Sequence, residues 1–290
     1  LPAVLGAFWK LHLPVVFAGR MLGMLASIGV VYLTYKLGKR LFNTEIGLIA
    51  SCLLVGSGSF LFFGSQVLTD VPSLFFALLG IILLLEGWDF LSGISIGLAS
   101  LTRFPQAPIV VLLGIYLLGN LLWDREELKI LLNRGLKLLA GFAVITIPYF
   151  ALNKIFLGSY SSPILTAAVG IQTSLPHSVT PGFYWVQLLK ENYLFVFALP
   201  AVLYFVKKRL WGTLTLLLMP VVAYFTYFFY IPNKEARYLL IFLPYLYLLA
   251  AHGISTLFHN KKQARTMAIL ASLVIGLYFV HDSAVADLGM

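Results

Sequence analysis

Ile231-Pro-Asn-Lys-Glu-Ala-Arg-Tyr238 is a short polar stretch between two apolar runs, 210–231 and 236–258, each long enough to cross a bilayer. It places three charged residues within four positions, in a chain that is 60% hydrophobic and 11% charged. Charged groups at a membrane boundary are costly to hold near lipid, so they usually serve a function. The stretch therefore predicts a transmembrane helix bundle with a polar site at one boundary.

The local pattern predicts how the cations of this stretch are displayed. Pro232 ends the preceding run, and Asn233 is a good N-cap for the next helix. Lys234 and Arg237 are three apart, so they would share one face of the first turn. Two cations beside free backbone N–H groups favour an anion, most naturally a phosphate. The alternative is a pair of interfacial anchors with Glu235 as local counter-charge.

Composition points to one membrane domain. With 290 residues and a mean hydropathy of +0.94, the chain reads as an all-α polytopic membrane protein, and we expect residues 1–290 to form a single domain. The net charge of +9 does not indicate nucleic acid, because the basic residues are spread among short loops between apolar runs. The single cysteine, Cys52, lies in an apolar run, which excludes an intramolecular disulfide and a thiolate metal site.

Ten candidate spans follow from the apolar runs. They are 13–35, 45–66, 70–87, 89–103, 106–123, 136–156, 193–207, 210–231, 236–258 and 265–281. Four basic clusters come after the first, fifth, seventh and ninth spans, around Lys39, Arg134, Lys208 and Lys262. All four lie on one side only if every span crosses, including the short run 89–103. Since basic loops are cytoplasmic, this predicts a cytoplasmic side and an outer side.

The unusual polar residues then collect on the outer side. They include Asp70, Arg103 and the 231–238 stretch, together with a loop or interfacial helix around 157–192 that is either a connector or a lid. Glu86 and Asp89 fall at a cytoplasmic turn, where we expect them only to be solvated.

Asp70 and Arg103 are the outer residues most suited to chemistry. Asp70, in Thr69-Asp-Val-Pro72, either caps a helix or offers a carboxylate to a metal or a polar substrate. Arg103 precedes Phe104-Pro105 at a break between two spans. It binds lipid headgroups, or shares an anionic ligand with Lys234 and Arg237. Arg20 lies deeper, inside the first span, where its side chain either extends outward to the membrane surface or meets an acid. We expect a buried pair, with a partner that the sequence does not identify.

These motifs together resemble the GT-C glycosyltransferases, multi-spanning enzymes that use polyprenyl-phosphate sugars, such as protein mannosyltransferases and aminoarabinose transferases. The resemblance rests on the outer Thr69-Asp70, on Gly97–Arg103 closing a short span, and on the late stretch. Asn233–Tyr238 is similar to the His-Lys-Glu-x-Arg-Phe signature of lipid-linked and glycolipid-anchor mannosyltransferases, with Asn for His and Tyr for Phe.

The resemblance implies a function. A sugar, such as a mannose-like hexose, would move from a polyprenyl-phosphate donor to an acceptor hydroxyl on a protein, glycan or lipid. This would occur on the outer face of the cell membrane, or of the endoplasmic reticulum in a eukaryote. Asp70 would be the second acidic residue and a ligand for Mg or Mn. Substrate and phosphate binding would fall to Arg20, Arg103, Lys234, Glu235, Arg237 and Tyr238.

One departure from the family pattern concerns the catalytic base. The family carries an acidic residue in its first outer loop, ahead of the position matching Arg20. Here no acidic residue comes before Glu45, which falls on the cytoplasmic side. The resemblance therefore implies that the base and the first helix precede Leu1, so that the chain is truncated at its N-terminus.

Two other classes compete with a transferase. A secondary transporter would use a broken helix such as the one at Arg103-Phe-Pro105, but residues 193–281 show no matching interruption. A non-catalytic protein that binds or flips lipid phosphates would use the same cations without chemistry. An acid in the first outer loop distinguishes the transferase from the lipid binder.

Overall fold

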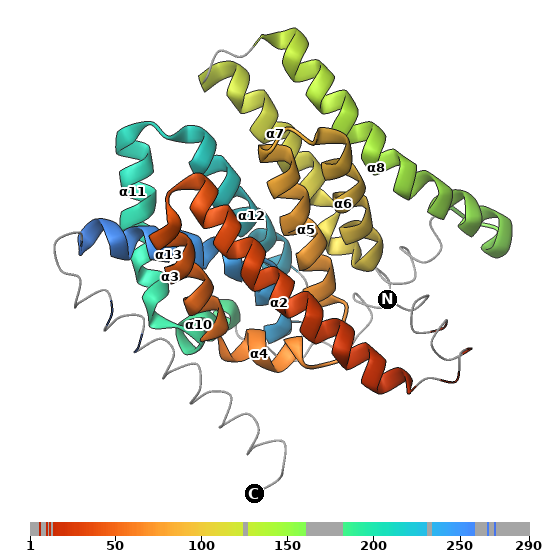
Figure 1. Cartoon of the computed structure of the whole chain (residues 1–290), viewed down its shortest axis with the longest axis horizontal. Helices are drawn as coiled ribbons and strands as arrows, with labels where there is room; N and C mark the ends of the chain where they lie inside the picture. Colours follow the sequence, from red (N-terminus) through yellow and green to blue (C-terminus); the bar gives the residue numbers. More distant parts are fainter. Residues whose placement is uncertain are drawn as a thin grey trace, which may run out of the picture.

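The computed structural model describes residues 14–123, 127–160, 182–230 and 234–258, and residues 6, 10, 12, 266 and 270 singly (Figure 1). The described ranges contain helices and no strand, which confirms the all-α prediction. The elements are α2 (Val15–Leu41), α3 (Thr44–Val55), α4 (Gly58–Gly64), α5 (Asp70–Leu85), α6 (Asp89–Thr102), η1 (Phe104–Gln106), α7 (Pro108–Trp123), α8 (Leu128–Leu157), α10 (Phe183–Glu191), η2 (Tyr193–Phe197), α11 (Ala198–Lys208), α12 (Trp211–Tyr230), η3 (Ala236–Ile241) and α13 (Leu243–Leu257).

Helices lie near nine of the ten predicted spans, but they differ in length. Four are long and apolar enough to cross a membrane, namely α2, α8, α12 and the segment Phe104–Leu121. Two bent pairs, α3 with α4 at 67° and α10 with Tyr193–Lys208 at 102°, qualify only if each pair is one span. Helices α5 and α6, with 16 and 14 residues, are shorter than the roughly 20 residues that a bilayer core requires. The number ten stays a prediction, and the tenth run, 265–281, lies almost wholly outside the described residues.

Helices α5, α6 and α8 pack side by side, with α6 in contact with both neighbours (Figure 1). Two glycines bring α6 and α8 together. A Cβ on Gly93 would lie 2.0 Å from the carbonyl oxygen of Leu138, and one on Gly141 would lie 2.0 Å from that of Phe90. Small residues that allow close backbone approach are the usual means of packing helices within lipid.

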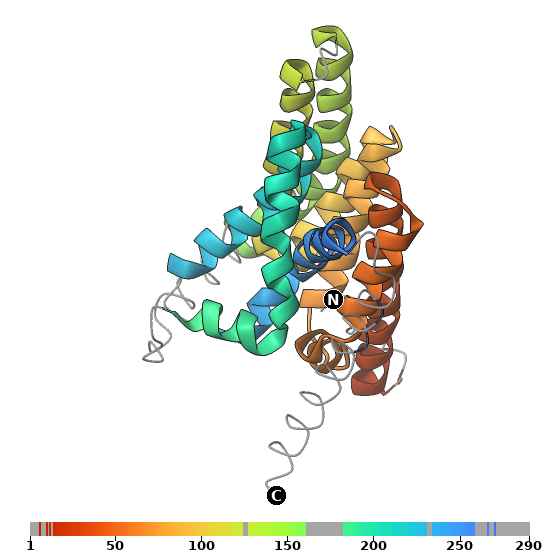
Figure 2. The same ribbon diagram turned by 90° about the vertical axis from the view of Figure 1, so that its left-hand side faces the viewer.

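Helix α13 lies at the centre of a second group of packed helices. It contacts α3, α11 and α12, and its residues from Leu243 to Ile254 are all buried. In Figure 2 this helix, in blue, lies in the middle of the molecule. A helix that is apolar all round is expected to be buried on every side.

Side-chain contacts place three of the four basic clusters at one end of the bundle. Lys36 Nζ lies 2.7 Å from Glu86, and Arg134 Nε lies 3.2 Å from Asp89 at the adjacent turn. Leu41, Trp123 and Arg209 line a common cavity, which brings in the third cluster. The fourth cluster, around Lys262, lies outside the described residues. Helix α6 runs from this end, at Asp89, to the opposite end, where Arg103 directly follows it.

Candidate functional site

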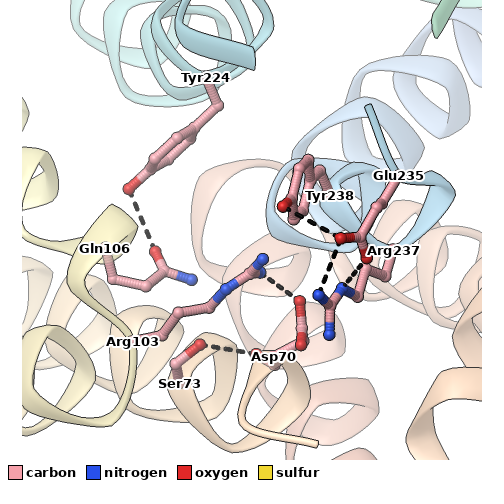
Figure 3. A network of polar contacts seen from close by, with 8 residues as sticks. All are labelled: Asp70, Ser73, Arg103, Gln106, Tyr224, Glu235, Arg237 and Tyr238. Atoms are coloured by element: carbon pink, nitrogen blue, oxygen red, sulfur yellow. Dashed lines mark hydrogen bonds and ion pairs between the residues drawn. The ribbon is translucent and has the colours of Figure 1, made fainter. Parts of the chain in front are cut away.

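Asp70 and Arg103 form a buried ion pair at the end of the bundle opposite the basic clusters (Figure 3). Asp70 is the first residue of α5 and Arg103 directly follows α6, so the antiparallel packing of the two helices brings them together. The side chain of Asp70 is 2% exposed and that of Arg103 is 11% exposed. A carboxylate buried this deeply requires such a partner.

Asp70 is not the N-cap of α5. That position belongs to Thr69, which makes no side-chain capping bond. The Asp70 carboxylate instead faces Arg103, while its charge still lies at the favourable N-terminal end of the helix. The capping alternative for Asp70 is therefore wrong by one residue.

The expected helical turn at Lys234 is also wrong. Glu235 has extended backbone, Ala236–Ile241 is a 3-10 helix, and α13 begins only at Leu243. Pro244 explains the break, because proline fits the first turn of α13 but would disrupt a helix that continued through it. The expected cap, Asn233, lies outside the described residues.

Arg237 has a local counter-charge. Its guanidinium forms an ion pair with Glu235, in which Nη2 donates to Oε1 at 3.0 Å. The Tyr238 hydroxyl donates to the same oxygen at 3.4 Å. Lys234 lies elsewhere, with Nζ 5.1 Å from the centre of the Phe229 ring. The two cations therefore do not share a helical face, and Glu235 has the counter-charge role given in the anchor alternative.

The structure nevertheless brings Arg103 and Arg237 to one aromatic ring. The Cζ atoms of Arg103 and Arg237 lie 5.2 Å and 5.8 Å from the centre of the Tyr238 ring. Both distances are within the range of cation–π attraction. Tyr238 in turn stacks on Phe228, with ring centres 4.7 Å apart. Two guanidinium groups from distant segments thus converge on a ring that packing holds in place.

Two further residues extend this cluster and were missed in the sequence. The Tyr224 hydroxyl of α12 donates to Gln106 Oε1 at 3.1 Å (Figure 3). Gln106 Nε2 is buried and has no hydrogen-bond partner within the described ranges. A signal was available for Gln106, a polar residue directly after Arg103-Phe-Pro105. Tyr224 lies within an apolar run and gave none.

Burial changes the acid–base properties of the cluster without removing its charges. Burial lowers the pKa of the Arg103 guanidinium, and the Asp70 carboxylate opposes that change. Arginine stays protonated in either case. Burial, together with the adjacent Glu235 carboxylate, raises the pKa of the Tyr238 hydroxyl. Tyr238 is therefore a neutral hydrogen-bond donor between two permanent cations.

The acidic residues of this site do not fit a divalent cation. Among the residues that the structure describes, no group of three or more His, Cys, Asp or Glu side chains comes together. Mg²⁺ and Mn²⁺ require several oxygen ligands. Asp70 faces Arg103, and Glu235 faces Arg237. A metal role for Asp70 stays a prediction that these contacts do not support.

Arg20 is not part of this cluster. Its side chain is exposed on α2 and makes no ion pair within the described part of the chain. The predicted buried pair is therefore wrong. Arg20 lies in the second turn of α2, close enough to the helix end for its long side chain to extend towards the membrane surface.

The fold and the site define a class of protein. A multi-pass helical bundle of this kind has the fold of the GT-C membrane glycosyltransferases. A family model described as dolichyl-phosphate-mannose-protein mannosyltransferase matches residues 2–152, more than half of the 290-residue chain. The chain belongs to this family.

Solved structures support the same fold. ArnT from Cupriavidus metallidurans in the apo state matches with a TM-score of 0.63 and 16% identity, over 81% of this chain and 45% of ArnT. ArnT bound to undecaprenyl phosphate gives 0.62 and 16%, over 82% and 46%. The Archaeoglobus fulgidus oligosaccharyltransferase in the apo form gives 0.61 and 15%, over 91% and 44%. The chain spans less than half the length of each. A comparison with curated protein sequences finds no match.

Proposed function

We propose that this chain is part of a membrane glycosyltransferase that takes a sugar from a polyprenyl-phosphate donor. The observation that carries the proposal is the convergence of Arg103 and Arg237 on Tyr238, each with its own carboxylate. The family description, and the ArnT structure bound to undecaprenyl phosphate, support a lipid-phosphate donor. The sugar is a mannose-like hexose, and the acceptor is a hydroxyl on a protein, glycan or lipid.

The two arginines act on the leaving group. As the acceptor oxygen bonds to the anomeric carbon, the bond from that carbon to the phosphate oxygen breaks and negative charge develops on the lipid phosphate. A guanidinium carries five N–H donors, so a carboxylate on one edge leaves others for phosphate oxygens. Cations already in position stabilise that charge without reorganisation. Arg237, whose side chain is 32% exposed, is the more accessible of the two.

The proton of the acceptor hydroxyl passes to a carboxylate base. Asp70 is not suited to this role, because its charge is held by Arg103 at a buried position. Its role is to fix Arg103 in place. No step in this proposal requires a metal ion.

The site faces away from the cytoplasm in this proposal. It lies at the end of the bundle opposite three basic clusters, and basic loops are retained in the cytoplasm. The protein would therefore act on the outer face of the cell membrane, or on the lumenal face of the endoplasmic reticulum in a eukaryote.

Sugar transfer in membranes tests the proposal. The whole protein, as its gene encodes it, is incubated with radiolabelled polyprenyl-phosphate sugars. Arg237→Ala should lower transfer roughly 10- to 100-fold, the range expected for losing a charge-assisted hydrogen bond in the transition state. Arg237→Lys should restore only part of it, because lysine lacks the planar fork.

Lys208→Ala, which removes an exposed cation at the opposite end of the bundle, is the matched control and should transfer as wild type. Equal transfer by wild type and Arg237→Ala would contradict the phosphate-binding role. Binding of the lipid without any transfer would favour a non-catalytic lipid binder.

A further inference from the structure

A second cavity lies between α4 and α10, beside the cluster formed by Arg103, Arg237 and Tyr238, which we call the arginine cluster. Its volume is about 240 Å³. One wall is formed by Ser59, Phe62 and Phe63 of α4, and the other by Gln187, Lys190 and Glu191 of α10. On each helix these residues are three and four apart, which places them on one face. These two helix faces lie on opposite sides of the cavity.

Buried hydrogen bonds hold the walls of this cavity in place. Glu191 is only 6% exposed, and its carboxylate accepts hydrogen bonds from the hydroxyl groups of Ser57 and Ser59. It also accepts from the Ser59 backbone N–H at 3.3 Å. These contacts join the end of α10 to the bend between α3 and α4. Among the residues that the structure describes, three hydrogen bonds thus fix the Glu191 carboxylate.

The lining has the chemistry that a sugar requires. The Gln187 amide and the Lys190 ammonium line the cavity and have no partner among the residues that the structure describes. Phe62 and Phe63 add apolar surface. A sugar ring presents hydroxyl groups around its edge and C–H groups on its faces, which matches this combination. A cavity of about 240 Å³ has room for one sugar ring.

The position of the cavity indicates that a sugar bound there would be the one carried by the lipid phosphate. Ala236 also lines it, and the next residue is Arg237 of the cluster. A sugar ring bonded to a phosphate at Arg237 would therefore lie close to the cavity. Helix α10 exposes Trp185 and Leu189 on its other side, which is typical of a helix at a membrane surface, where a lipid presents its headgroup.

We propose that the cavity between α4 and α10 binds the sugar ring of the lipid-phosphate donor, with Gln187 and Lys190 donating to its hydroxyl groups. This inference rests on the proposed function, since it assumes a glycosylated lipid phosphate at the arginine cluster. It adds a sugar-binding role for α10, a helix that the phosphate-binding argument does not use.

Binding measurements with matched lipids test this inference. Whole protein in lipid nanodiscs is titrated with bare polyprenyl phosphate, and with the same lipid carrying mannose, glucose or N-acetylglucosamine. At least one glycosylated lipid should bind wild type more tightly than the bare lipid. Gln187→Ala and Lys190→Ala should each weaken that lipid about fivefold, as expected for one lost hydrogen bond, and leave the bare lipid unchanged. Leu189→Ala, on the exposed side of α10, is the control and should change neither affinity.

Two results would overturn the sugar site. One is equal affinity of wild type for the bare lipid and every glycosylated lipid. The other is an equal loss of both affinities in Gln187→Ala and Lys190→Ala. Failure of phosphate binding at the arginines looks different, because wild type would then bind none of the lipids, and the sugar site would fall with it. Failure of catalysis alone would appear as lipid binding without sugar transfer, and the sugar site would then stand or fall on the two results above.

Discussion

Two buried ion pairs at opposite ends of the bundle are built alike. Asp70 is the first residue of α5 and Asp89 is the first residue of α6. Their side chains are 2% and 5% exposed, and each meets an arginine, Arg103 in one case and Arg134 in the other. By burial and pairing alone, the two ends are equivalent.

The difference lies in what surrounds each arginine. Arg134, from α8, binds Asp89 through Nε and donates through Nη2 to the Leu84 carbonyl at 2.9 Å, so its donors tie α8 to α5 and α6. Arg103 instead shares the Tyr238 ring with Arg237 (Figure 3). It also lies in the cluster that contains Gln106, whose amide nitrogen has no hydrogen-bond partner in the described part of the chain. The Asp89–Arg134 pair is therefore structural, because a backbone carbonyl also binds its arginine. The Asp70–Arg103 pair is a candidate binding site, because a second cation lies beside its arginine.

The largest expected effect comes from removing each arginine in turn. Arg103→Ala and Arg134→Ala each leave a buried carboxylate unpaired, which costs about 3–5 kcal/mol. Both variants should unfold at clearly lower temperature in detergent. Transfer per folded molecule should be lost in Arg103→Ala and kept in Arg134→Ala. Equal loss of transfer in both would remove the distinction between the two ends.

A smaller effect is expected at the shared ring. Tyr238→Leu removes two cation–π contacts and the stack on Phe228, together about 2 kcal/mol of folding free energy. It should also weaken binding of bare polyprenyl phosphate, because both guanidinium groups lose their support. Tyr238→Phe keeps the ring and loses only a hydrogen bond of 3.4 Å, so it should stay close to wild type in both assays. If Tyr238→Phe were as damaging as Tyr238→Leu, the hydroxyl and not the ring would be the essential group.

The smallest effect is expected at Tyr224. Tyr224→Phe removes the hydrogen bond to Gln106, for about 0.5–1.5 kcal/mol of folding free energy. Lipid affinity should change less than twofold, since neither arginine depends on this contact. Thermal unfolding and lipid titration on the same preparation measure both quantities. A tenfold loss of affinity would instead place Gln106 and Tyr224 in direct contact with the lipid phosphate.

The sequence allowed most of the helix positions to be predicted, because apolar run lengths set them. It also indicated that Asp70, Arg103 and Arg237 would lie at one end. The basic loops mark one side of the membrane, and counting the spans between them places these three residues on the other side. It did not reveal that Asp89, expected to be solvated at its turn, is buried against Arg134. A carboxylate next to a turn looks the same in sequence whether or not a distant helix covers it.

Two other differences from the sequence predictions have one local and one tertiary cause. Helix α13 begins later than the Asn233-Lys234 pattern predicts, because Pro244, ten residues after Lys234, fits only the first turn of a helix. The roles of Gln106 and Tyr224 depend on α12 lying against α7, a contact that no local pattern encodes.

The affinity of the protein for bare polyprenyl phosphate tests the central claim most directly. Wild type, Arg237→Ala and Lys208→Ala are titrated in nanodiscs under the same conditions. Because Arg237 is partly exposed, its loss should barely change the unfolding temperature. The account predicts an affinity roughly tenfold or more lower for Arg237→Ala and unchanged for Lys208→Ala. Equal affinities for all three proteins would contradict the claim that the arginines around Tyr238 bind the lipid phosphate.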